Sequence, residues 1–219
     1  MATVLILAPT FDGPTNETRS WALEIANPAE AAGNTVILTD EDVNRPTAEQ
    51  KLASNPDVVL FYGHGLPDCW PADRVVCSAY CLVDASNDDQ LRAPTVIAVA
   101  CDTQRLAERV TDRRPGSYFG YEADFQYVPG REPVFREAAN ATARAILVDG
   151  IDAGDPAWTY TNEVYERLIG EYQGRLVRGE DPLAQLVVSC LEEDMYAFCL
   201  WEGVAGQAAT LHRTVRTQA

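Results

Sequence analysis

The chain has 219 residues, of which 47% are hydrophobic and 23% are charged, a balance typical of a globular protein with a sizeable core. Its formal net charge of −16 argues against a nucleic-acid-binding protein, because neutralising phosphates requires clustered Lys and Arg side chains. No stretch reaches the roughly 18 apolar residues that a membrane span requires, so we expect neither nucleic acid nor a membrane among the partners.

The N-terminal segment, residues 1–8, lacks the basic region of a secretion signal, and its apolar run has the length of a strand. The sequence therefore predicts a cytoplasmic protein whose thiols are reduced. The six cysteines include no CxxC pair and no cysteine–histidine spacing typical of zinc sites, so we expect no metal and no cofactor.

The first part of the chain alternates short apolar runs with helical segments. Strands are expected at 3–8, 35–38, 57–62, 95–100 and 116–121, and helices at 15–32, 47–54 and from 101 to about 110. Between them, the hydrophobic pieces 74–77 and 79–83 predict a hairpin over the edge of the sheet. Continuous apolar strands joined by helices indicate a parallel sheet covered on both faces.

From Glu132 onward the pattern is helical, with helices expected at 133–148, 155–178 and 182–201 and a frayed tail after them. We therefore predict one α/β domain over 1–219, a three-layer sandwich around a mainly parallel sheet. Its strand-rich core covers 1–125 and its helical remainder covers 130–205. Right-handed crossovers place the C-terminal strand ends on one edge, where open α/β sheets bind ligands.

His64 and Cys101 each follow such a strand end. Glycines flank His64 on both sides, which lets the backbone approach a ligand closely, although a tight turn capping the strand explains the same pattern. A free cysteine is most often a small buried hydrophobe, and we read five of the six that way. Cys101 is expected to differ, because it opens a helix and faces His64, and both the helix dipole and an imidazolium lower a thiol pKa. The other five cysteines are Cys69, Cys77, Cys81, Cys190 and Cys199.

Two segments carry a family resemblance. Residues 57–65, Asp-Val-Val-Leu-Phe-Tyr-Gly-His-Gly, and residues 95–101, Thr-Val-Ile-Ala-Val-Ala-Cys, resemble the signature blocks of the caspase-like (clan CD) cysteine peptidases. In that family one hydrophobic strand ends in His-Gly and the next ends in Ala-Cys. In the gingipain-like and CHAT branches, Thr or Ser often stands two residues after the cysteine, and the chain resembles them in having Thr103 there. Only Ala100-Cys101 remains of the caspase motif Gln-Ala-Cys-Arg-Gly, so recognition of aspartate is not supported.

The resemblance, which covers roughly residues 3–125, implies a cysteine endopeptidase. Cys101 would attack the scissile carbonyl and form a thioester, and His64 would transfer protons. The backbone N–H groups of Gly65 and Cys101 would form the oxyanion hole. Asp68 and Asp102 are either solvated carboxylates or part of a pocket for a basic P1 side chain. The partners implied are a protein or peptide substrate and a regulatory protein.

Two alternatives remain open on a similar fold. In the first, Cys101 is inert and the chain is a caspase-like or flavodoxin-like binding module. In the second, the same pair hydrolyses an amide bond of a small molecule, although residues 99–103 lack the Gly-x-Cys-x-Gly elbow of glutaminases. Nucleotide binding is disfavoured, because residues 8–13 lack the Gly-x-Gly-x-x-Gly pattern that lets the backbone reach a pyrophosphate.

Overall fold

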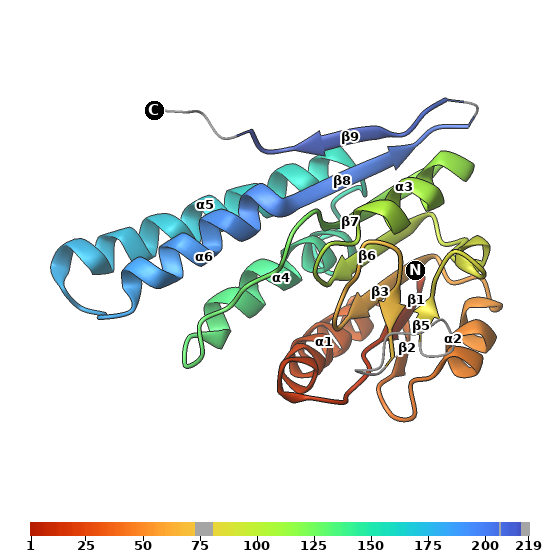
Figure 1. The fold of residues 1–219 in the computed structure, drawn as a ribbon, viewed down its shortest axis with the longest axis horizontal. Coiled ribbons are helices and arrows are strands. Elements are labelled where there is room, and N and C mark those ends of the chain that lie inside the picture. The colour runs from red at the N-terminus through yellow and green to blue at the C-terminus, as the bar shows by residue number, and fades with distance from the viewer. Residues whose placement is uncertain (73–80, 206, 216–219) are drawn as a thin grey trace.

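A computed structural model describes residues 1–72, 81–205 and 207–215 of the chain. Within those ranges the central sheet has seven strands in the order β2-β1-β3-β6-β7-β8-β9, with helices packed around it (Figure 1). The strands of this sheet are β1 (Thr3–Leu7), β2 (Thr35–Thr39), β3 (Val58–Tyr62), β6 (Thr95–Val99), β7 (Gly116–Tyr121), β8 (Phe198–Gly203) and β9 (Thr210–Arg213). The helices are α1 (Gly13–Ala31), α2 (Arg45–Leu52), α3 (Gln104–Arg113), α4 (Glu132–Leu147), α5 (Asp155–Arg178) and α6 (Ala184–Ala197).

The sheet is parallel from β2 to β7, as the sequence predicts, and antiparallel from β7 to β9. Every residue of β3 and of β6 is buried, which explains why both read as unbroken apolar runs. These two strands lie side by side at the centre of the sheet, so the segments that follow them emerge at neighbouring points of one edge.

Two hydrophobic clusters cover the two faces of the sheet, because successive strand residues point to opposite sides. Leu60 and Tyr62 pack with α1, α4, α5 and α6 on one face. Val59 and Phe61 pack with α2, α3 and a short hairpin on the other. The expected α/β sandwich of three layers is therefore confirmed. The antiparallel pair α5 and α6 extends well beyond the sheet (Figure 1).

The expectation of one long helix over 182–201 is wrong at its C-terminal end. Helix α6 ends at Ala197, and the next residues form β8, which pairs with β7. The expectation of a frayed tail is wrong for residues 210–213, because β9 pairs with β8 and places Nε2 of His212 2.7 Å from a Glu202 carboxylate oxygen; residues 216–219 lie outside the described part of the chain. Residues 198–201 are apolar, so in the sequence they look like a continuation of the buried face of α6. They form a strand because they pair with β7, and a local pattern does not reveal that pairing.

The structure contains a short hairpin whose second strand falls within the predicted piece 79–83. Strand β4 (Trp70–Pro71) pairs antiparallel with β5 (Cys81–Val83). The predicted piece 74–77, with Cys77, lies outside the described residues, as do residues 79–80 of the second piece. No helix in the described part of the chain is long and apolar enough to cross a membrane.

Candidate active site

The register of the two central strands brings His64 and Cys101 to one place. Tyr62 of β3 pairs with Val99 of β6, and each site residue lies two positions beyond its member of that pair. Both side chains line a single cavity of about 180 Å³ at the C-terminal edge of the sheet. The structure thus brings together the two residues that the sequence singled out.

The rest of the cavity wall is neutral. Among the described residues that line it, none carries a carboxylate and none is basic other than His64. The N-terminal part of α1 and Phe125 both contribute to this wall. The lining residues besides the pair are Pro14, Thr15, Thr18, Gly63, Val99, Ala100 and Phe125.

Asp12 holds the imidazole of His64. Its Oδ2 lies 2.9 Å from Nε2 of His64, and its Oδ1 accepts a hydrogen bond from the backbone N–H of Thr15, so the same side chain caps helix α1. Because an ionised carboxylate only accepts hydrogen bonds, Nε2 of His64 carries the ring proton. Nδ1 of the same ring is then the nitrogen that can take a proton from a reacting group and return it. Burial works against ionisation of Asp12, but the hydrogen bonds from Thr15 and His64 outweigh it and hold its pKa below the usual value.

Sequence reasoning missed Asp12. One signal was available: Asp12-Gly-Pro-Thr15 is an N-terminal capping pattern just past the end of the first strand. In a parallel sheet that position lies on the same edge as His64 and Cys101.

The surroundings of Cys101 differ from the expectation. Helix α3 begins at Gln104 with Thr103 as its N-cap, so Cys101 precedes the helix rather than opening it. The half-buried thiol lies 3.8 Å from the carbonyl oxygen of Phe125, and within the described residues no hydrogen bond joins it to His64. Burial raises the pKa of Cys101, and the negative charges of Asp124 and Asp194 raise it further. The prediction of a lowered thiol pKa is therefore wrong.

Gly65 lies directly against the backbone of Cys101. A Cβ atom at position 65 would come within 1.8 Å of the Cys101 carbonyl oxygen and 2.8 Å of its backbone nitrogen, so only glycine fits there. In the described part of the chain, neither the Gly65 N–H nor the Cys101 N–H donates to another backbone group. The backbones of Gly65 and Cys101 therefore lie close together, with neither N–H group used in a backbone–backbone hydrogen bond in the described residues.

The two acidic candidates have different surroundings. Asp68 forms ion pairs with Arg105 and Arg109 of helix α3 and does not line the cavity. Asp102 follows the nucleophile candidate with a left-handed backbone, φ +39°, and its N–H donates to the carbonyl of Ala123. Burial raises the pKa of Asp102, and the charges of Asp124 and Asp68 add to that shift.

The C-terminal helices reach this site through Asp194 of α6. Its Oδ1 accepts a hydrogen bond of 2.8 Å from the backbone N–H of Gln126, next to the cavity residue Phe125. The side chain is fully buried, and burial raises its pKa well above the usual value. Asp194 therefore fixes the loop that contacts the Cys101 thiol.

Within residues 1–72, 81–205 and 207–215, no group of three or more His, Cys, Asp and Glu side chains is placed to hold a metal ion. What the site offers chemically is a thiol, an imidazole held by a carboxylate, and two backbone donors around a small neutral cavity.

No family model matches the chain, and no curated protein matches it. Among solved structures, the fold is similar to that of the Arg-specific cysteine proteinase gingipain R, with a TM-score of 0.55 and 14% sequence identity. The match covers 78% of this chain and 42% of the gingipain R chain, so the chain spans less than half of that proteinase. The likeness is one of fold, and it agrees with the mostly parallel, helix-flanked sheet of a caspase-like protein.

Proposed function

We propose that this chain is a caspase-like cysteine endopeptidase, of the gingipain-like or CHAT branch, with Cys101 as nucleophile and His64 as acid and base. The observation that carries the proposal is the shared cavity at the ends of two adjacent strands. There a thiol and an imidazole held by Asp12 line the same wall. The fold similarity to a cysteine proteinase supports the same class of reaction.

The raised pKa of Cys101 determines the order of proton transfer. The thiol keeps its proton in the resting enzyme, so His64 removes it as the sulfur attacks the scissile carbonyl. The N–H groups of Gly65 and Cys101 stabilise the oxyanion of the tetrahedral intermediate. His64 then protonates the leaving amine, and a water molecule activated by His64 hydrolyses the thioester.

A basic P1 side chain is the proposed preference. Asp68 is ion-paired with two arginines, which leaves two acidic candidates: Asp102, the next residue in the chain after Cys101, and Asp124, whose charge acts on the Cys101 thiol. Burial raises the pKa of Asp102, and repulsion from the Asp124 carboxylate raises it further; a cationic substrate side chain bound near these two carboxylates would relieve that repulsion.

Replacing Asp12 with asparagine is expected to lower kcat by about 10²-fold with little change in KM, because the amide reverses the hydrogen bond to His64 and moves the proton to the other ring nitrogen. Asparagine caps helices as well as aspartate does, so the unfolding temperature should stay close to that of the wild type. Asp12→Ala is the matched control, since it also removes the cap and should lower that temperature by about 2–4 °C. A wild-type kcat in Asp12→Asn would contradict the role of Asp12 in positioning the imidazole of His64.

Covalent peptide probes test the function directly. Peptidyl chloromethyl ketones with Arg, Leu or Asp at P1 are incubated with the protein, and the modified residue is located by peptide mass mapping. We expect alkylation of Cys101 alone, fastest with Arg and slowest with Asp. The rate should rise with pH above neutrality, because the thiol pKa is raised.

The outcomes separate the parts of the proposal. Faster reaction with the Asp probe overturns the P1 preference and leaves the peptidase assignment intact. Absence of alkylation with all three probes, while iodoacetamide still modifies the denatured protein, favours the inert binding module. His64→Ala should slow the probe reaction at Cys101, and an unchanged rate contradicts the acid–base role of His64.

A further inference from the structure

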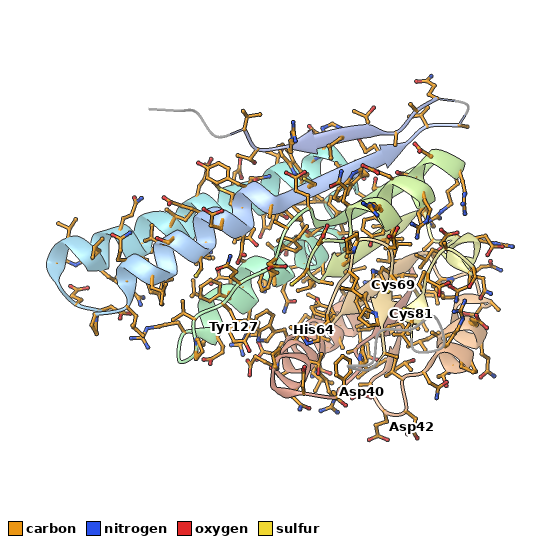
Figure 2. The ribbon with its side chains drawn as sticks, in the orientation of Figure 1. Asp40, Asp42, His64, Cys69, Cys81 and Tyr127 are labelled. Carbon is orange, nitrogen blue, oxygen red and sulfur yellow. The ribbon has the colours of Figure 1, made fainter. Side chains whose placement is uncertain are left out.

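Cys69 and Cys81 form a close pair of thiols outside the candidate active site. Figure 2 labels both residues beside each other. Their sulfur atoms are 2.8 Å apart, and the two residues are only 6% and 3% exposed. A disulfide has a sulfur–sulfur distance of about 2.05 Å, so a movement of less than about 1 Å would join them.

The backbone fixes both ends of this pair. Cys81 begins β5, which pairs with β4, and Cys69 directly precedes β4. Cys69 also exchanges two backbone hydrogen bonds with Leu66, of 3.1 and 3.2 Å. The neighbouring Trp70 stacks on Phe61 of the central sheet, with ring centroids 4.5 Å apart. The pair is therefore held by secondary structure and core packing on both sides.

We propose that Cys69 and Cys81 form a reversible disulfide that ties the segment 64–69 to strand β5. The oxidant is a small-molecule disulfide such as oxidised glutathione. One thiolate attacks it and forms a mixed disulfide, which releases one small thiolate, and the second cysteine thiolate displaces the other. The two cysteines lose two protons and two electrons, and the small disulfide becomes two thiols.

The segment that this bond would fix carries active-site groups. It begins at His64 and Gly65 and ends at Cys69, and it also contacts α3, where the Leu106 N–H donates to the Pro67 carbonyl. Arg109 holds it further through ion pairing with Asp68. A disulfide would add a covalent tie from this segment to β5.

Burial slows the exchange without preventing it. Burial raises the pKa of the Cys69 thiol, and Cys81 and the charges of Asp84 and Asp68 raise it further, so little thiolate exists at neutral pH. Since the thiolate is the attacking species, the rate of oxidation should increase about tenfold for each pH unit between 7 and 9.

The cross-link is tested in the full-length Cys77→Ser protein, because one tryptic peptide, residues 75–92, contains both Cys77 and Cys81. The folded protein is equilibrated with mixtures of reduced and oxidised glutathione at pH 8, quenched with acid, alkylated after denaturation and digested. We expect a disulfide between peptides 52–74 and 75–92 that forms at high oxidised glutathione and is lost at high reduced glutathione. Cys190 and Cys199, which are also buried, should be recovered alkylated and serve as internal controls.

Stability gives an independent readout. Oxidation should raise the unfolding temperature by about 5 °C or more, since a disulfide restricts the unfolded chain, and Cys81→Ser should abolish both the shift and the cross-link. Full alkylation of Cys69 and Cys81 at every glutathione ratio overturns the proposal, as does a bond from either residue to another cysteine. Because the readouts are mass and temperature, they do not depend on whether the chain is a peptidase.

Discussion

Cys101→Ala is expected to reduce peptide hydrolysis by about 10⁴-fold or more, because no other described group in the cavity can form the thioester. The substitution removes one half-buried sulfur atom, so the unfolding temperature should change by only a few degrees. Steady-state kinetics on the peptide that the probe panel selects, with thermal unfolding alongside, measures both quantities.

His64→Ala should cause a loss of similar size, and the double variant should be little worse than either single one, since the two residues act in the same chemical step. Cys199→Ala is the matched control, because this cysteine is buried in β8 and does not line the cavity. It should retain wild-type kcat below its unfolding temperature. Substantial turnover by Cys101→Ala, or additive losses in the double variant, would rule out the proposed pair.

Gly65→Ala is expected to damage both activity and stability. The new methyl group would lie 1.8 Å from the Cys101 carbonyl oxygen and 2.8 Å from its backbone nitrogen, and these are backbone atoms that cannot rotate away. The segment 64–69 must therefore shift, at a cost of about 1–3 kcal/mol in the free energy of unfolding. The displaced Gly65 N–H no longer meets the oxyanion, which lowers kcat by about 10²- to 10³-fold.

Gly170→Ala provides the comparison for that variant. A Cβ atom at this position of α5 meets nothing within 4 Å, so alanine should keep full activity and raise stability by about 0.5–1 kcal/mol through its higher helix propensity. Denaturant unfolding together with kcat distinguishes the two variants. A Gly65→Ala protein with wild-type kcat would contradict the role of this backbone as an oxyanion donor.

The parallel core could be predicted from the sequence because each buried strand carries its own signal. Residues 57–62 and 95–100 read as strands in isolation, and the rule that parallel strands end on one edge then places His64 beside Cys101. That inference needs only the apolar pattern of each strand and the rule that parallel strands end on the same edge of a sheet.

Other features of the site depend on three-dimensional contacts that local pattern does not encode. The bond from Asp12 to His64 links residues 52 positions apart. The raised pKa of the Cys101 thiol comes from burial and from charges at Asp124 and Asp194, none of which is adjacent in sequence. The sequence argument, which rests on a helix start at Cys101 and on a neighbouring imidazolium, therefore gives the wrong direction for the pKa of this thiol.

The antiparallel end of the sheet has a consequence for biosynthesis. Strand β7 gains its second neighbour only from β8, which lies beyond three long helices in the chain (Figure 1). Until synthesis reaches Phe198, the hydrogen-bonding groups of residues 116–121 form an open strand edge able to pair with other chains. Such a non-local pairing also forms slowly. Emerging chains are thus most prone to aggregate while α4, α5 and α6 are being made, and chaperone dependence should be concentrated in that interval.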